Sequence, residues 1–409
     1  MDSKPFDIVL YGATSFVGEI TARYLLQEIG SNQEIKWAIA GRSESKLNQL
    51  KASLGSDATD LPIIIADAAD AESLDLLCKQ TRVVISTVGP YALYGEPLIK
   101  ACVANGNDYC DLTGEAYWIK LMMDRYQNAA KESGARIINC CGFDSIPSDL
   151  GTYFLQQKAQ ESSGNYFKKV KLGVKAMKGG ASGGTIASML EMFIAAKADP
   201  QVRKAMGNPY ILCPENHSYK VRQSRVKGAV YDKDFNCWSA PFVMEGINTR
   251  VVLRSHALQE MPYGDQFSYS EVMLMGKGYR GRMRSLGLTL GLGAFVLGAF
   301  VSPLRKLMQK FLLPKPGEGP SEQEQLEGYF DMRILGKDEQ HQLTVKVTGD
   351  RDPGYGSTAK MLAQSALCIA YDIDKSDLPG GFWTPSTAMG DQLIRRLCKY
   401  AGLTFECID

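Results

Sequence analysis

Short runs of apolar residues alternate with amphipathic stretches over the first 141 residues of the chain. Each apolar run has the length of a strand, and each amphipathic stretch is long enough for a helix. Uninterrupted runs such as 62–66 and 82–87 are typical of strands buried on both faces of a parallel sheet. The alternation therefore predicts an α/β fold with strands at 7–10, 35–40, 62–66, 82–87, 108–112 and 135–141. The expected helices lie at 18–29, 43–54, 96–104 and 116–132.

The pattern changes after residue 148. Longer β-like runs follow at 170–177, 249–257 and 267–275, a hairpin pattern lies at 328–335 and 341–348, and helical patterns lie at 185–198, 355–370 and 387–400. We expect a second, α+β domain that contains a mostly antiparallel sheet.

The domain boundaries follow from this change. We expect a nucleotide-binding domain at 1–148 and a substrate and dimerisation domain at 149–354, with the helices of 355–409 packing back on the first domain. The Pro/Gly-rich stretch 314–320 is expected to be a turn or linker.

Composition excludes several classes of function. The net charge of +1 provides no basic field for nucleic acid. The ten cysteines show no paired spacing, which fits a reducing compartment, and the N-terminus lacks the pattern of a secretory signal. The three histidines are far apart in the sequence, so we expect no metal site. We expect a cytoplasmic protein.

A glycine-rich turn follows the first expected strand. Its first glycine permits a tight turn, its last permits close packing of helix on sheet, and the helix N-terminus offers N–H groups to a pyrophosphate. A serine stands where the middle glycine is usual, and its hydroxyl could itself bind phosphate. The alternative is a tight turn without a ligand. The expected cofactor-binding residues here are Gly12, Ala13, Thr14, Ser15, Phe16, Val17 and Gly18.

The end of the second expected strand indicates which dinucleotide binds. Chains that bind NAD usually carry Asp or Glu there, whereas residues 40–43 contain no carboxylate. Arg42 is placed to hold a 2′-phosphate, with Ser43 as a further donor and Lys46 as a weaker candidate. The sequence therefore predicts a Rossmann-like, doubly wound parallel sheet that binds NADP(H); the alternative for Arg42 is an ordinary surface arginine.

Further candidates lie at the carboxyl ends of later strands, where ligands bind in such folds. Thr87, Val88 and Gly89 should pass beside the nicotinamide. By the same rule we expect a second group on the ligand side, although each member could equally be a helix cap or a turn residue. This group consists of Asp111, Thr113, Glu115, Gly142, Asp144 and Ser145.

Several segments carry a family resemblance: GATSFVG (12–18), AIAGRS (38–43), STVGPYALYGEPLIKAC (86–102), DYCDLTGE (108–115), CGFDSIPSDLG (141–151), KPGEGPSEQ (315–323), GDRDPGYGSTAKM (349–361) and GGFWTPSTAMG (380–390). The sequence resembles the saccharopine dehydrogenase-like oxidoreductases, most of all their trans-acting enoyl reductase branch. The resemblance implies a two-domain NADP(H)-dependent enzyme. For that branch it implies reduction of a double bond in a lipid-type acyl substrate, either a small molecule or carrier-bound.

Such a reduction delivers a hydride to the β-carbon of an unsaturated thioester and a proton to its α-carbon. Tyr91 and Asp144 are the candidate catalytic groups near the ring, and ordered water is the alternative proton donor. Two other functions stay open. One is an amino-acid dehydrogenase, which would need clustered cations such as Arg222, Arg225, Arg250 and Arg254. The other is a membrane-associated scaffold that retains a nucleotide fold without turnover.

Residues 285–304 form an uncharged run of membrane-spanning length, flanked on both sides by basic residues. Its glycines and Pro303 weaken a continuous span. We expect peripheral contact with a membrane surface or a lipid. A buried or oligomer-forming helix and a true span are the alternatives, and a homodimer is a further expectation.

Overall fold

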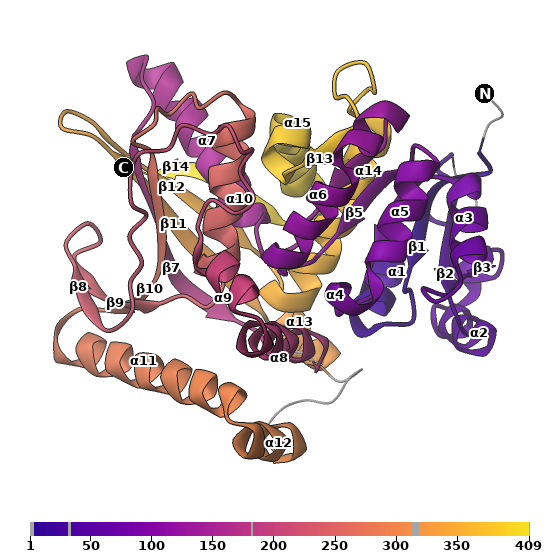
Figure 1. Cartoon of the computed structure of the whole chain (residues 1–409), viewed down its shortest axis with the longest axis horizontal. Helices are drawn as coiled ribbons and strands as arrows, with labels where there is room; N and C mark the ends of the chain where they lie inside the picture. Colours follow the sequence, from indigo (N-terminus) through magenta and orange to yellow (C-terminus); the bar gives the residue numbers. More distant parts are fainter. Residues whose placement is uncertain (1–3, 32–33, 181–182, 312–318, 409) are drawn as a thin grey trace. The chain divides into compact units, whose positions relative to one another are not determined.

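The computed structural model describes residues 4–31, 34–180, 183–311 and 319–408. Contacts divide the chain into two compact units (Figure 1). The first unit draws on Met1–Asp144, Pro316–Gly319 and Gly354–Ala401, and the second on Ser145–Lys315, Pro320–Pro353 and Gly402–Asp409. Most of the turn expected at 314–320 lies outside the described residues.

The first unit is built on a seven-stranded sheet in the order β13-β6-β5-β4-β1-β2-β3, and every pair in it is parallel. Its central strands are apolar and buried on both faces, as the uninterrupted runs predicted. The strands are β1 (Phe6–Tyr11), β2 (Trp37–Gly41), β3 (Ile63–Ile65), β4 (Thr81–Ser86), β5 (Asp108–Asp111), β6 (Arg136–Ile138) and β13 (Gly381–Trp383). Strand order reverses between β1 and β4, so ligands are expected at the carboxyl ends of these strands.

Helices cover both faces of this sheet. Crossovers between parallel strands are right-handed, so connections that run toward opposite edges of the sheet place their helices on opposite faces. α14 packs on β1, β4 and β5 beside α1, while α3, α5 and α6 form a continuous layer. The helices of this unit are α1 (Phe16–Ile29), α2 (Glu44–Ser53), η1 (Ser56–Ala58), α3 (Ala71–Gln80), α4 (Tyr91–Tyr94), α5 (Glu96–Ala104), α6 (Ala116–Ser133), α14 (Thr358–Tyr371) and α15 (Pro385–Tyr400). A π-turn, η2 (Pro353–Ser357), leads into α14.

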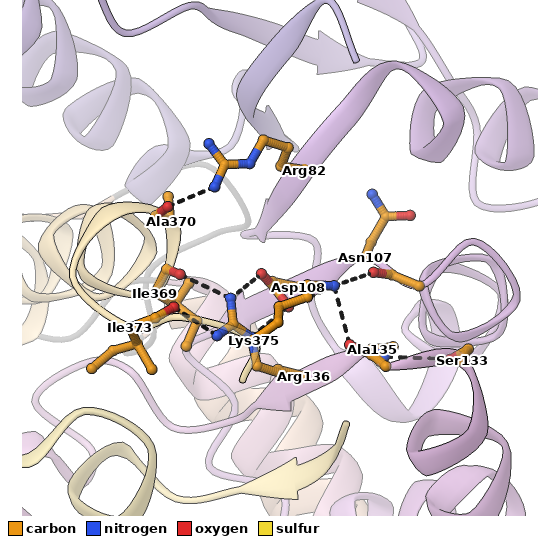
Figure 2. Close-up of polar contacts among 12 residues, drawn as sticks. Arg82, Asn107, Asp108, Ser133, Ala135, Arg136, Ile369, Ala370, Ile373 and Lys375 are labelled. Carbon is orange, nitrogen blue, oxygen red and sulfur yellow. Dashed lines mark hydrogen bonds and ion pairs between the residues drawn. The ribbon is translucent and has the colours of Figure 1, made fainter. Parts of the chain in front are cut away.

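A buried ion pair ties α14 to the sheet, as Figure 2 shows. Arg136 on β6 donates through Nε and Nη2 to the two carboxylate oxygens of Asp108 on β5, at 2.8 and 2.6 Å. Its guanidinium also donates to the carbonyl oxygens of Ile369 and Ile373 at the end of α14. Arg82 donates to the carbonyl oxygen of Ala370. These cations donate hydrogen bonds to carbonyl groups at and just after the end of α14, and their positive charge stabilises the negative end of the helix dipole.

The second unit contains a seven-stranded sheet in the order β14-β12-β11-β7-β10-β9-β8. Only the pair β7–β10 is parallel, so the sheet is mostly antiparallel as predicted. Its strands are β7 (Lys169–Lys178), β8 (Val230–Asp232), β9 (Cys237–Pro241), β10 (Ser268–Gly276), β11 (Tyr329–Lys337), β12 (Gln342–Gly349) and β14 (Leu403–Ile408). Its helices are α7 (Ile146–Ser163), α8 (Gly183–Ala198), α9 (Pro200–Gly207), α10 (Glu245–Leu258), α11 (Gly278–Phe300), α12 (Ser302–Phe311) and α13 (Glu322–Leu326).

The strand predicted at 249–257 is wrong, because these residues belong to α10. The β-branched residues Thr249, Val251 and Val252 favoured a strand. Nearly every residue from Ile247 to His256 is buried, so the helix has no polar face and its period is hidden in the sequence.

The C-terminal segment also departs from expectation. Residues 402–408 do not pack on the first unit with 355–400, because β14 pairs with β12 at the edge of the second sheet. In addition, no pattern in the sequence predicted β13, whose three residues extend the first sheet beside β6. A strand of three residues is too short to show a period.

Candidate functional site

Two glycines shape the turn between β1 and α1. Gly12 adopts φ +84°, and a Cβ there would lie 2.6 Å from Cγ2 of Val88. A Cβ on Gly18 would lie 2.2 Å from the carbonyl oxygen of Gly12. Both positions therefore require glycine, the first for its left-handed backbone and both for the close approach of helix, turn and β4.

Ser15, which replaces the usual middle glycine, is the N-cap of α1. Its hydroxyl accepts a hydrogen bond from the N–H of Gly18 at 3.0 Å and donates to Oγ1 of Thr87 at 2.9 Å. Thr87 in turn donates to the carbonyl oxygen of Gly12 at 2.8 Å. The serine thus joins the turn to the end of β4, a structural use of the hydroxyl that the sequence did not reveal.

The N-terminus of α1 is suited to an anion. Within the described part of the chain, the backbone N–H groups of Phe16 and Val17 have no hydrogen-bond acceptor. Ala13 is buried, whereas the side chains of Thr14 to Val17 are partly exposed. Free N–H groups at a positive helix end, beside a backbone that glycine keeps open, fit the pyrophosphate of a dinucleotide.

Arg42 and Ser43 follow β2 at the same edge of the sheet. Arg42 is exposed, while Ser43 caps α2 by accepting from the N–H of Lys46 at 3.4 Å. Asp67, which follows β3, lies close enough to Tyr11 for its charge to act on the phenol. Burial and this carboxylate raise the pKa of Tyr11 to about 12, although the positive charge of Arg42 opposes the rise. The exposed guanidinium of Arg42 lies at the corner where the sequence predicted that a 2′-phosphate binds.

The end of β4 forms the opposite side of the site. Thr87 is buried and donates a hydrogen bond to the glycine-rich turn. Val88 is partly exposed beside Gly12, and Gly89 is exposed. The structure therefore brings the segment 87–89 and the glycine-rich turn together, as their sequence positions predicted.

Two aspartates lie at the carboxyl ends of the neighbouring strands. Asp111 at the end of β5 is fully buried and accepts hydrogen bonds from the N–H groups of Thr113 and Cys140 and from the side chains of Tyr109 and Asn139. Burial raises the pKa of Asp111 to about 6, although these donors oppose the rise. Four donors make Asp111 the organiser of the loops after β5 and β6.

Asp144, at the end of the loop after β6, is half-buried. A Cβ on Gly114 would lie 3.9 Å from its Oδ1, so the carboxyl group lies beside the segment that follows β5. Burial and the negative charge of Asp111 raise its pKa to about 7. A carboxyl group with this pKa can donate a proton near neutral pH.

Tyr91 points inward rather than toward a ligand. Its hydroxyl donates to the carbonyl oxygen of Ser86 at 2.9 Å, and its ring packs against Trp118. Burial raises the pKa of this phenol well above its usual value. Glu115 accepts the N–H groups of Tyr91 and Ala92, which fixes the start of α4. This geometry favours a structural function for both side chains.

The other members of the predicted group do not gather at one place, and each has a structural partner of its own. Thr113 is buried and accepts from the N–H of Glu115 at 3.1 Å, while Gly142 permits close packing of Thr358 on α14. Ser145 belongs to the second unit, where its hydroxyl donates to Asn248 at 3.2 Å. Asp144 thus differs from Asp111 and Glu115: all three are titratable groups at this edge of the sheet, but the side chain of Asp144 is partly exposed, whereas those of Asp111 and Glu115 are buried.

The sequence did not predict an aromatic contact at the phosphate-binding turn. The ring of Phe16 packs edge-on against Tyr355 at 5.1 Å between ring centroids, and Gly319 lies against the same ring. Both partners come from parts of the chain that return to the first unit. The motifs GEGPSE and DPGYGS were visible, but a single sequence does not show which turn they approach.

Comparison with known proteins identifies the family. The saccharopine dehydrogenase NADP-binding domain model matches residues 8–138. A putative trans-acting enoyl reductase of Mycobacterium tuberculosis is 38% identical over 98% of this chain and 97% of its own length. The chain belongs to the saccharopine dehydrogenase-like oxidoreductases. A trans-acting enoyl reductase of Mycobacterium bovis is 37% identical, covering 96% of both chains.

The fold comparison agrees with this family. The apo saccharopine dehydrogenase of Saccharomyces cerevisiae aligns with 99% of this chain and 100% of its own, with a TM-score of 0.51 at 13% identity. The chain is therefore an NADP(H)-dependent oxidoreductase with a Rossmann-like sheet and a second, mostly antiparallel sheet. No cluster of three potential metal ligands occurs among the residues that the structure describes.

Three of the four arginines suggested for an amino-acid substrate have structural partners in the second unit. Arg250 donates to the carbonyl oxygens of Met206, Asn208 and Gly246, and Arg254 donates to that of Leu212. Arg225 forms an ion pair with Glu245 at 2.7 Å. These bonds hold α10 and its surroundings in place.

Removing Arg42 tests the coenzyme preference. We expect Arg42→Ala to weaken NADPH binding by about 10- to 100-fold, because charged hydrogen bonds contribute about 1.5–3 kcal/mol, while NADH binding changes little. Calorimetric titration of both nucleotides measures the difference. Arg125→Ala, which removes another exposed arginine, serves as the control. Equal NADPH affinity of Arg42→Ala and the unaltered protein would assign the 2′-phosphate to other residues.

Proposed function

We propose that this oxidoreductase reduces the carbon–carbon double bond of an α,β-unsaturated acyl thioester, free or held on a carrier. The observation that carries the proposal is the similarity over nearly the whole chain to proteins named trans-acting enoyl reductases. Bound NADPH supplies the hydride. The turn at 12–18 and Arg42 hold the dinucleotide, and the segment 87–89 borders the end where the acyl chain is reduced.

The remaining requirement is a proton for the α-carbon. We assign it to Asp144, whose carboxyl group lies at the ligand edge of the sheet and has a pKa raised to about 7. Asp144 gives up its proton as the thioester enolate collapses, and it regains one from solvent after product leaves. Asp111 holds the loop that carries this group and, through its charge, keeps the proton on Asp144.

The direct test is oxidation of NADPH by the purified full chain in the presence of a series of enoyl thioesters. Absorbance of NADPH reports turnover, and mass spectrometry of the acyl product reports the gain of two hydrogens. Saturated thioesters with NADPH serve as controls, and saccharopine is tested in the opposite direction, with NADP⁺, because its carbon–nitrogen bond is already reduced. Oxidation of saccharopine by NADP⁺, without turnover of any enoyl thioester, would replace the proposal by an amino-acid dehydrogenase, and NADPH binding without any turnover would also contradict it.

The pH profile tests the assignment of Asp144. Because the carboxyl group must be protonated to donate, we expect kcat to fall as pH rises through about 7. Asp144→Asn should lower kcat by about 10²- to 10⁴-fold and remove this dependence, the usual range for a general acid. NADPH affinity should not change. The matched control is Asp124→Asn, on the exposed part of α6. A variant that keeps the same fall near pH 7 would exclude Asp144 as the donor.

A further inference from the structure

The apolar run at 285–304 lies largely in α11 and is attached to the second unit near its start. The hydroxyl of Ser285 donates to the carbonyl oxygen of Ser239 on β9 at 2.5 Å. The guanidinium of Arg282 lies over the ring of Trp238, 5.5 Å from its centroid. These contacts fix one side of the helix on the sheet.

The opposite side of α11 is apolar and exposed. Leu290 is 71% and Leu297 is 62% exposed, and together with Met283 and Leu286 they recur at the spacing of one helical face. In α12 the exposed Leu304 and Leu307 extend the apolar surface. We call these six residues the apolar face. α11 is long and apolar enough to cross a membrane, yet only 17% of its most apolar window is buried. It is therefore not a core helix of this chain.

The charged residues around α11 and α12 favour an anionic lipid surface as the partner of the apolar face. Between Glu271 and Glu318 the sequence contains no acidic residue, whereas it contains eight cations: Lys277, Arg280, Arg282, Arg284, Arg305, Lys306, Lys310 and Lys315. Two copies of the chain meeting through this surface would bring like charges together without carboxylates to pair them. Anionic lipid headgroups complement the cations, and acyl chains accept the leucines.

The sheet topology excludes a simple crossing of the membrane. β10 precedes α11 and β11 follows α12, and both strands are hydrogen-bonded to β7. A spanning α11 would place these two neighbours of β7 on opposite sides of the bilayer. A return crossing would have to be made by residues 302–318, which include Arg305, Lys306 and Lys310. The helix can lie along a membrane but cannot span it while the sheet is intact.

We propose that the apolar face of α11 and α12 docks on the surface of an anionic membrane, with both helices in the plane of the interface. The proposal does not depend on which acyl substrate the enzyme reduces. Docking at the interface would hold the second unit at a lipid surface while the sheet of that unit stays in water.

Vesicle flotation of the full chain tests the proposal. We expect the protein to float with vesicles of phosphatidylcholine and phosphatidylglycerol, and at least about tenfold less with phosphatidylcholine alone. Leu290→Asp combined with Leu297→Asp should lower binding at least about tenfold, because each leucine loses its burial in lipid. Arg280→Gln combined with Arg284→Gln should reduce binding to the anionic vesicles by a similar factor.

The control is Leu76→Asp, which places the same charge on an exposed leucine of α3. It should leave flotation unchanged, and equal melting midpoints would show that the variants are folded. Failure of the unaltered protein to float overturns the proposal, as does an equal loss with Leu76→Asp. A dimer in light scattering that dissociates in the Leu290→Asp, Leu297→Asp variant, without vesicle binding, would assign the face to a second copy of the chain instead.

Discussion

Replacing Arg136 with methionine is expected to lower the free energy of unfolding by about 3–5 kcal/mol, the range seen when one partner of a buried ion pair is removed. Arg136 and Asp108 are 2% and 3% exposed, so the buried aspartate would lose both hydrogen bonds from Arg136 and keep the more distant ammonium of Lys375, 3.7 Å from its Oδ1. The carbonyl oxygens of Ile369 and Ile373 would lose their donor as well (Figure 2). Urea denaturation followed by circular dichroism measures the loss.

Two further variants separate charge from packing. Arg136→Met combined with Asp108→Asn should recover part of the stability, because the buried side chain at position 108 no longer carries a charge that has lost its two hydrogen bonds from Arg136. Arg125→Met, which breaks the exposed pair with Glu96, should leave the denaturation midpoint nearly unchanged. If Arg136→Met behaved like Arg125→Met, the hydrogen bonds of Arg136 would contribute little to holding α14 on the sheet.

The second large effect, a loss of both stability and NADPH affinity, is expected for Gly18→Ala. The new Cβ would meet backbone atoms of Gly12 and Ala13 at 2.2–2.8 Å, and backbone cannot move aside as a flexible side chain can. Overpacking of this kind costs about 1–3 kcal/mol of stability. The start of α1 must shift away from the turn, and NADPH affinity should fall by about 100-fold or more, since a displacement near 1 Å can cost that much at a positioned site.

Gly207→Ala provides the matched control, because nothing lies within 4 Å of a Cβ at that position. Its nucleotide affinity should equal that of the unaltered protein in calorimetric titration. Unchanged NADPH binding by Gly18→Ala, with the variant folded by circular dichroism, would show that the dinucleotide does not use this turn.

Six of the seven strands of the first sheet could be predicted from the sequence, because most of them are continuous apolar runs between amphipathic helices. That signal is local, and so is the glycine pattern at 12–18 that begins α1. α10 could not be predicted in this way, because its polar residues, such as Arg250 and Arg254, are buried against carbonyl groups and erase the helical period. Burial on all sides makes a helix and a buried strand look alike in sequence.

The geometry of the candidate site could be predicted to a similar extent, while its function as a cofactor site stays a prediction. Residues that act through the backbone, such as Gly12 and Gly18, have positions that sequence spacing fixes. The direction of a side chain is decided by tertiary contacts, so the inward hydroxyl of Tyr91 and the ring of Tyr355 against Phe16 could not be foreseen. The raised pKa of Asp144 depends on Asp111, which lies 33 positions earlier in the numbering and was recognised only as another strand-end residue.

The capping serine has a consequence for how this family changes during evolution. Ser15 and Thr87 are separated by 72 positions but share one hydrogen bond, and each also holds the backbone of the turn. A lineage that acquires glycine at position 15 loses the cap of α1 and the partner of Thr87 together. The two positions should therefore covary among relatives. Searches that demand glycine at every position of the dinucleotide turn will overlook the lineages that adopted the serine–threonine pair.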